Sequence, residues 1–263
     1  MNDSGKQHRK DDSKRGQSAA GTASGKTSPT GGGTARFYPV FLSLEGRTCL
    51  VVGGGAVGER KVRELLRCGV SIRVISRDLT PWLAERLAEG RLVLSGSEYG
   101  KAHLDGADLV FAATSDMEVN RTIAGDARSR GLWCNMATDP GLGSFIVPSV
   151  VRKGPLCIAI STGGSSPAAA KAIRVKLDLD FGREWERFIG FLGLLRETFK
   201  SKGIVDSAAG RIYTEIAAIP VPDLMREGKA EEAFSRVAAA LAGVLERSDL
   251  TPIWDKAWKH SSL

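Results

Sequence analysis

Short apolar runs alternate with stretches of helical periodicity along the first half of the chain. The apolar runs predict buried strands over 47–52, 70–76, 91–94, 108–113 and 132–136. Between the strands, apolar residues recur at helical spacing over 56–68, 81–88 and 120–130, and Gly69 is expected to end the first helix. Strands that alternate with helices predict a parallel, doubly wound α/β sheet with right-handed crossovers.

The pattern changes after residue 139. Two apolar runs, 144–151 and 156–161, flank an Arg-Lys-Gly-Pro turn and predict a hairpin. Ser166 is expected to cap a helix that runs to about residue 179, with Pro167 in its first turn. From Glu184 onward the chain is expected to be helical, including residues 229–247. Trp254 and Trp258, four residues apart, are expected to pack a further helix.

Composition separates a tail from this body. The first 35 residues are rich in Gly, Ser, Thr and Lys and almost free of large apolar side chains, so they are expected to be disordered. Residues 1–36 carry seven basic and three acidic residues, and therefore hold +4 of the net charge of +7. A solvated extension is favoured over a nucleic-acid-binding arm. We expect a Rossmann-like domain over 36–143, a small α+β region over 144–180 and a helical domain over 181–263.

Several classes of protein are not indicated. No apolar stretch approaches the roughly 18 residues of a membrane span, and the N-terminus has no secretory apolar segment. The four cysteines are widely spaced, which predicts buried free thiols in a reducing cytoplasm; they are Cys49, Cys68, Cys134 and Cys157. The three histidines, His8, His103 and His260, have no Cys or acidic neighbour at metal-ligand spacing, so we expect surface histidines, with His103 in a loop, and no metal site.

A glycine motif provides the strongest functional signal. The sequence Gly-Gly-Gly-Ala-Val-Gly at 53–58 fits G-x-G-x-x-G and lies between a predicted strand and a predicted helix. Gly53 would permit the tight turn, Gly55 would let a pyrophosphate approach the backbone, and Gly58 would let helix and strand pack closely. Ala56 and Val57 complete the helix N-terminus, whose N–H groups attract phosphate. The alternative is a glycine-rich turn without a cofactor.

Two further positions bear on the cofactor. Asp78 follows the second strand at the distance where an acid binds the ribose hydroxyls of NAD. Arg77 leaves NADP open, because an arginine there can accept a 2′-phosphate. Thr114 follows the fourth strand, at the edge where ligands bind in doubly wound sheets, although it could equally belong to a helix cap. The residues favour NAD.

Together, these segments resemble the precorrin-2 dehydrogenase family, which includes the N-terminal module of sirohaem synthase. The resemblance covers about residues 37–200 and rests on motifs that occur in the family's order. They are FYPVFL at 37–42, GGGAVGERK at 53–61, AATSD at 112–116, Cys-Asn at 134–135, SFIVPS at 144–149 and STGGSSP at 161–167.

The resemblance implies an NAD-dependent oxidoreductase that converts precorrin-2 to sirohydrochlorin in sirohaem synthesis. It also implies a homodimer, with 144–180 as the dimerisation and substrate region. Substrate contacts are implied at Ser144, Thr162, Gly163 and Gly164, and a turn rich in N–H groups before a helix suits a substrate with many carboxylates. A plain strand-to-helix turn is the alternative.

This sequence differs from the family's pattern at the position of the catalytic aspartate. Aligned without a gap, its position falls on Thr138, and Asp139 stands one residue later. Because threonine has no useful pKa, Asp139 is the predicted base; a turn before Pro140 is its alternative role.

Three other functions remain open. A bifunctional enzyme would also insert ferrous iron, a non-catalytic regulatory module would bind NAD without turnover, and a nucleic-acid-binding protein would need the tail.

Overall fold

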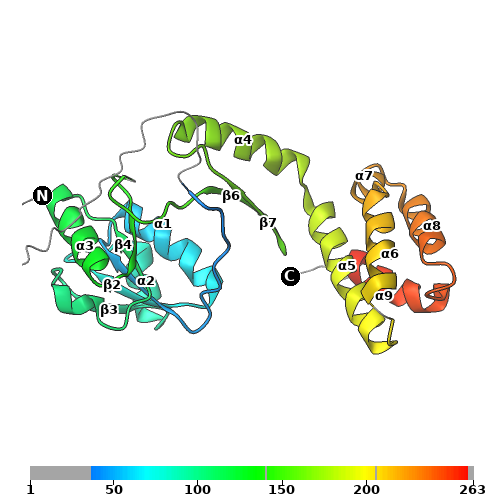
Figure 1. Cartoon of the computed structure of the whole chain (residues 1–263), viewed down its shortest axis with the longest axis horizontal. Coiled ribbons are helices and arrows are strands. Elements are labelled where there is room, and N and C mark those ends of the chain that lie inside the picture. The colour runs from blue at the N-terminus through cyan, green and yellow to red at the C-terminus, as the bar shows by residue number, and fades with distance from the viewer. Residues whose placement is uncertain (1–36, 140, 205, 260–263) are drawn as a thin grey trace, which may run out of the picture. The chain divides into compact units, whose positions relative to one another are not determined.

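The computed structural model describes residues 37–139, 141–204 and 206–259, and its first half contains a five-stranded parallel sheet (Figure 1). The strands are β1 (Thr48–Val52), β2 (Ser71–Ile75), β3 (Val93–Gly96), β4 (Leu109–Ala112) and β5 (Trp133–Met136). Their order is β3-β2-β1-β4-β5, so the chain moves outward from β1 in one direction and then returns to fill the other side. The predicted doubly wound α/β sheet is confirmed.

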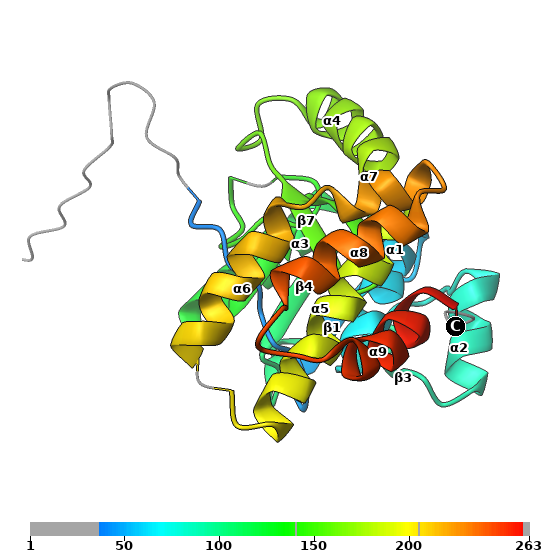
Figure 2. The ribbon, with the colours of Figure 1, turned by 90° about the vertical axis from the view of Figure 1, so that its right-hand side faces the viewer.

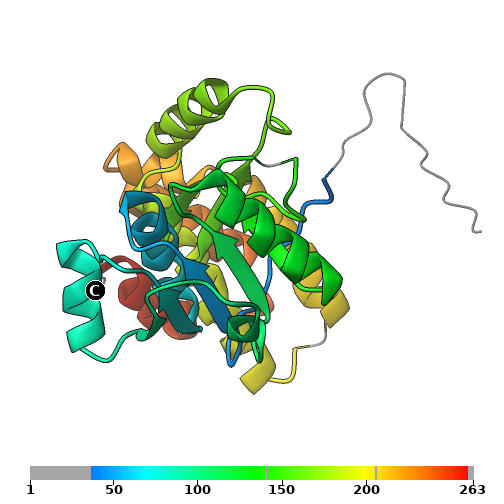
Figure 3. The same cartoon turned by 90° about the vertical axis from the view of Figure 1, so that its left-hand side faces the viewer.

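Helices cover both faces of this sheet. They are α1 (Ala56–Leu65), α2 (Pro81–Ala88) and α3 (Met117–Ser129), with the 3₁₀ helices η1 (Leu66–Cys68) and η2 (Lys101–Leu104). Cys49 and Val51 pack into the core shared with α1 and α2, whereas Leu50 and Val52 pack into the core shared with α3. In Figure 3, α3 is green and lies in front of the sheet. The apolar run from Cys49 to Val52 is therefore buried on both faces of the sheet.

Three boundaries differ from the expected ones. The first helix changes to 3₁₀ geometry at Leu66, before Gly69 with φ of 65° ends it. The third strand begins at Val93 because the N–H of Arg91 donates to Arg86 O and closes α2. The third helix begins at Met117, because the Asp116 carboxylate caps it by accepting from two backbone N–H groups. His103, predicted in a loop, lies in η2.

The predicted hairpin is confirmed as the antiparallel pair β6 (Ser149–Lys153) and β7 (Leu156–Ile160). The expected strand over 144–148 is wrong. Pro148 has no N–H to donate, and Ser144 bonds to the backbone of β5 instead. As predicted, Ser166 caps the next helix, α4 (Pro167–Asp180), by accepting a 3.1 Å hydrogen bond from Ala169 N.

The remaining helices share one apolar core. They are α5 (Arg183–Ser201), α6 (Asp206–Ala218), α7 (Val221–Arg226), α8 (Ala230–Ala240) and α9 (Arg247–Lys259). Figure 2 looks onto this group, coloured yellow to red. The expected helical structure over 229–247 is confirmed for α8 but not beyond it, because the chain turns after Ala240 through Gly243, whose φ is 78°. The expected packing of Trp254 and Trp258 is confirmed, since both are buried in this core.

Within the described residues, no helix is both long enough and apolar enough to span a membrane.

Candidate functional site

The glycine loop lies between β1 and α1 and has different surroundings at each glycine. Gly53 has a φ of 116°, and a Cβ there would lie 2.4 Å from Ala113 O. A Cβ on Gly58 would lie 1.8 Å from Gly53 O, so helix and strand approach too closely for any side chain. Gly55 is the exception, because a Cβ on it would meet nothing within 4 Å. The loop is therefore tightly packed behind and open in front, at Gly55.

The structure requires glycine at position 54, although the G-x-G-x-x-G motif leaves that position unspecified. The loop after β2 crosses it so closely that a Cβ would lie 2.4 Å from Asp78 O. Two hydrogen bonds join the segments, Gly54 N to Ser76 Oγ at 2.9 Å and Thr80 N to Gly54 O at 3.0 Å. The Ser76 hydroxyl donates in turn to Asp78 O at 2.6 Å. These bonds fix the backbone of Asp78 beside the glycine loop.

A groove of about 850 Å³ runs along this carboxyl edge of the sheet. Of the predicted residues, those that line it are Gly53, Gly55, Arg77, Asp78 and Thr114. Ala56, Val57 and Gly58 form the first turn of α1 beside it. The sequence reasoning missed three residues after β3, Ser97, Glu98 and Tyr99, and three on α3, Glu118, Val119 and Thr122. The strand β3 ends two residues later than predicted, and the correct end would have revealed the first group.

Thr114 is held in place by a buried amide. Asn120 of α3 is fully buried, and its Oδ1 accepts from Thr114 N at 3.1 Å and from Thr114 Oγ1 at 2.8 Å. Its Nδ2 donates to Thr114 O at 3.0 Å. Asp116 caps α3, so Thr114 does not have the helix-capping role that the sequence left open as an alternative. Asn120 fixes the peptide at which β4 enters the groove.

The charged side chains at the other end of the groove differ in whether they have a partner. Arg77 forms an ion pair with Glu98 across the ends of β2 and β3. The exposed Asp78 carboxylate makes no hydrogen bond or ion pair within the described part of the chain. Tyr99, also in the groove wall, donates to Asp126 at 3.2 Å, and burial together with that carboxylate raises the pKa of its phenol. A free carboxylate is therefore available here.

The segment after β5 contains the predicted base. Asp139 is half-buried, and its Oδ1 accepts from Gly141 N at 2.9 Å, which makes a turn of the kind expected for an aspartate before a proline. Thr138 is exposed. Nearby, the buried Asn135 donates from Nδ2 to Phe145 O at 3.0 Å. Neither Thr138 nor Asp139 belongs to the groove lining.

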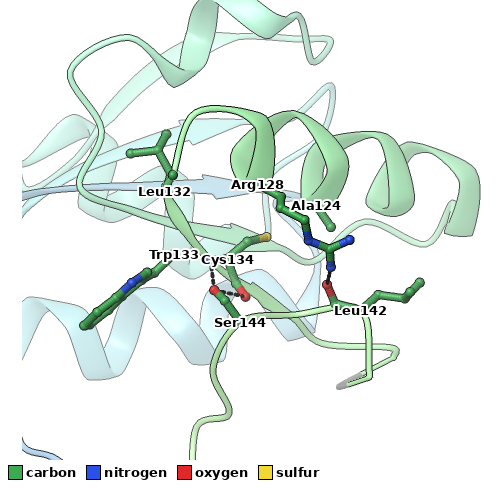
Figure 4. A pocket seen from close by; sticks show the side chains of 8 residues that line it. Ala124, Arg128, Leu132, Trp133, Cys134, Leu142 and Ser144 are labelled. Carbon is green, nitrogen blue, oxygen red and sulfur yellow. Dashed lines mark hydrogen bonds between the residues drawn. The ribbon is translucent and has the colours of Figure 1, made fainter. Parts of the chain in front are cut away.

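Ser144 faces β5. Its hydroxyl accepts from Cys134 N at 2.7 Å and donates to Cys134 O at 3.3 Å. Figure 4 shows these bonds at a small cavity of about 210 Å³, where Arg128 of α3 also donates to Leu142 O at 2.9 Å. The chain after residue 141 is thereby attached to the edge strand, and the Ser144 hydroxyl is already engaged.

The turn at 161–166 holds its shape through its own hydroxyls. Thr162 Oγ1 donates to Ser166 O and accepts from Ser166 N, both at 3.1 Å. Gly163 and Gly164 have φ of 62° and 91°, and a Cβ on either would meet nothing within 4 Å. The turn is therefore open at both glycines.

Two of the four thiols, Cys49 and Cys134, are buried. Burial raises the pKa of Cys49 to about 12 and that of Cys134 to about 11. Cys68 and Cys157 are only half-buried, contrary to expectation. Across the described residues, no group of three or more His, Cys, Asp or Glu is placed to hold a metal ion. His8 and His260 lie outside those residues.

Known proteins share these regions. Residues 40–149 match the family described as putative NAD(P)-binding, and residues 153–178 match the central domain of sirohaem biosynthesis proteins. The siroheme synthase of Methylobacillus flagellatus is 36% identical over 205 residues, which are 78% of this chain and 44% of that protein. The siroheme synthase of Chromobacterium violaceum is 36% identical over 200 residues, 76% of this chain and 42% of that protein. The chain spans less than half the length of these relatives.

A solved structure agrees in fold over most of the chain. The precorrin-2 dehydrogenase SirC superimposes with a TM-score of 0.66 at 27% identity, and the match covers 77% of this chain and 100% of that one. The range that matches the putative NAD(P)-binding family includes the glycine loop, and this match supports a nicotinamide cofactor. Over its NAD(P)-binding and sirohaem-synthase central domains, the chain belongs to the family of precorrin-2 dehydrogenases and sirohaem synthase N-terminal modules.

Proposed function

We propose that this chain dehydrogenates precorrin-2 to sirohydrochlorin, with NAD⁺ as the oxidant. The reaction removes one hydride and one proton from the substrate, and yields NADH and H⁺. The observation that carries the proposal is the open glycine loop at the carboxyl edge of a parallel sheet, in a chain related to siroheme synthases and to SirC. When bound, the nicotinamide supplies the hydride acceptor. The protein supplies binding, orientation and the base.

The residues around the groove suit a dinucleotide. Gly55, at the N-cap of α1, has no side chain to cap the helix, so no side-chain cap from the described residues occupies the first N–H groups of α1. Gly55, Ala56, Val57 and Gly58 would hold the pyrophosphate there. The unpaired Asp78 carboxylate would accept from the ribose hydroxyls, which supports NAD, and Thr114 would contact the nicotinamide half.

Asp139 is proposed as the base that takes the proton. Only Oδ1 of its carboxylate is used in the turn with Gly141, which leaves Oδ2 for the substrate. Thr138, one residue earlier, has no group that could accept a proton at neutral pH. The Asp139 carboxylate would therefore combine a structural and a chemical role.

One pair of substitutions separates these roles. Asp139→Asn keeps an oxygen that can accept from Gly141 N but removes the carboxylate, whereas Thr138→Val removes a hydroxyl only. NADH formation would be followed by absorbance with NAD⁺ and enzymatically produced precorrin-2. We expect turnover in the wild type and in Thr138→Val, and a fall of about 10²-fold or more in Asp139→Asn. Wild-type turnover with an unchanged Asp139→Asn rate would reject this base. Absent wild-type turnover despite NAD⁺ binding would favour a regulatory module.

The substrate carries many carboxylates, and the turn at 161–166 is proposed to bind some of them. The absence of a Cβ at Gly163 and Gly164 leaves the backbone accessible at the N-terminus of α4. Thr162 would act by shaping the turn, because its hydroxyl is occupied by Ser166. For the same reason Ser144 would act by holding the 142–145 segment on β5.

We propose that a second copy of the chain covers the 144–180 region, between a cofactor domain over 36–143 and a helical domain over 181–263. The hairpin and α4 bury only Val151, Ile160 and Ala170 together, and two strands alone are marginal in water. Leu179 is 77% exposed on α4, and Ile173 and Val175 are also exposed. Light scattering should give a dimer that Leu179→Asp weakens; a monomeric wild type would refute the proposal.

A further inference from the structure

The choice between NAD and NADP depends on which partner Arg77 has. An arginine at the end of the second strand can accept a 2′-phosphate, and an aspartate there can accept ribose hydroxyls. This chain has both, as Arg77 and Asp78. Arg77 forms an ion pair with Glu98, which follows the next strand of the sheet, and this pair affects whether Arg77 or Asp78 determines the preferred dinucleotide.

The sheet geometry brings Glu98 to this position. β2 and β3 are parallel neighbours, so the residues after both strands meet at the same edge. Their register shifts by one residue after Val74, because Ile75 pairs with Gly96 and leaves Ser95 as an extra residue in β3. Such an irregularity re-aims the side chains beyond it. The N–H of Ser76 donates to Gly96 O at 3.0 Å and keeps the two strand ends together.

The resulting charge pattern is unfavourable for a 2′-phosphate. Glu98 neutralises the one guanidinium that lines this end of the groove, and Asp78 adds a carboxylate without a partner among the described residues. A phosphate dianion would therefore meet two carboxylates and an arginine that is already paired. Two ribose hydroxyls carry no charge and can donate to a carboxylate.

We propose that Glu98 is a specificity-determining residue: its ion pair with Arg77 occupies and neutralises the guanidinium in the groove wall, and so disfavours the phosphorylated dinucleotide. This inference rests on the proposed function, because it concerns the same groove. The pair is open to solvent, with 73% of the Arg77 side chain and 69% of the Glu98 side chain exposed. Salt will screen it, so the expected effect is modest and largest at low ionic strength.

Binding of NADH and NADPH to the full chain, followed by nicotinamide fluorescence, tests the inference without any turnover. We expect Glu98→Gln to tighten NADPH binding roughly fivefold at low salt and to leave NADH within about twofold. Adding Arg77→Gln to that variant should remove the gain. The control is Glu85→Gln, which neutralises an exposed carboxylate that pairs with Arg86 outside the groove, and it should change neither affinity.

The outcomes separate this inference from the proposed function. An unchanged NADPH-to-NADH ratio in Glu98→Gln would overturn it, as would a gain that persists after Arg77→Gln or appears equally in Glu85→Gln. A wild type that prefers NADPH would also overturn it. Dinucleotide binding with the expected selectivity but without precorrin-2 turnover would support the inference while rejecting the proposed reaction.

Discussion

Gly54 offers a sharp test of the packing behind the groove. In Gly54→Ala the new Cβ would lie 2.4 Å from Asp78 O and 2.8 Å from both Leu79 Cδ2 and Ser76 Oγ. An ordinary carbon-to-oxygen contact is about 3.3 Å, so the 76–80 loop would have to retreat by about 1 Å. Two of the three atoms belong to the backbone or to a hydrogen-bonded hydroxyl, which leaves little freedom to rotate away.

The expected cost comes from this geometry. Overpacking costs about 1–3 kcal/mol, and the hydrogen bonds between Gly54 and the 76–80 loop are worth about 1 kcal/mol each. We expect Gly54→Ala to lower the free energy of unfolding by about 2–4 kcal/mol. For a chain of this size, Tm falls by about 2–4 °C for each kcal/mol. Differential scanning calorimetry should therefore detect the change easily.

Gly55→Ala is the matched control, because it adds the same methyl group one residue away. Its Cβ meets nothing within 4 Å, and its φ of −81° suits alanine. The loss of a glycine N-cap should cost at most about 1 kcal/mol, whereas NADH affinity should fall because the methyl group enters the open side of the loop. If Gly54→Ala has the same Tm as the wild type, or if Gly55→Ala is the less stable of the two variants, the assigned roles of these glycines are wrong.

Two further predictions concern buried polar groups. Asn120→Ala should lower the free energy of unfolding, measured in urea, by about 2–3 kcal/mol, because Thr114 N–H loses its partner. The same substitution should weaken NADH binding. Additive effects of Asn120→Ala and Thr114→Ala in a double-mutant cycle would contradict the assigned coupling between the two residues. Lys61 is half-buried, and burial, with a smaller contribution from Arg60, lowers its pKa from 10.5 to about 8. The unfolded chain therefore binds more protons between about pH 8 and 10.5, so stability should rise with pH there. Lys61→Met should be on the order of 1–3 kcal/mol more stable at pH 7 and lack that rise, and an identical pH profile would refute the reasoning.

The sequence predicted the parts of the fold that local patterns determine. The central strand β1 is apolar on both faces and ends at glycines, so its position and the motif at 53–58 were recognisable. The third strand was misplaced because β3 is an edge strand whose first residues, Val93 and Leu94, are exposed. Its apolar pattern therefore carried little information about burial, and the extra residue Ser95 shifted the positions after it. Glu98 was missed for that reason.

Other site features depend on contacts between distant segments, which no local pattern encodes. Asn120 looked like an ordinary helix residue, but its amide is buried beneath Thr114. Ser144 looked like the start of a strand, and its hydroxyl instead pairs with the backbone of Cys134. A polar side chain in such a place satisfies a particular backbone group, and identifying that group requires the three-dimensional fold.

These side-chain bonds have a common consequence for ligand binding. Ser76 bonds to the glycine loop, Asn120 bonds to the end of β4, and Asn135 bonds to the chain at Phe145. Loops that are already ordered lose little conformational entropy when a ligand binds, so more of the contact energy appears as affinity. If the proposed dinucleotide site is correct, these hydrogen bonds hold its backbone in place, and substitutions at the three residues should weaken dinucleotide binding even where the side chain does not touch the cofactor.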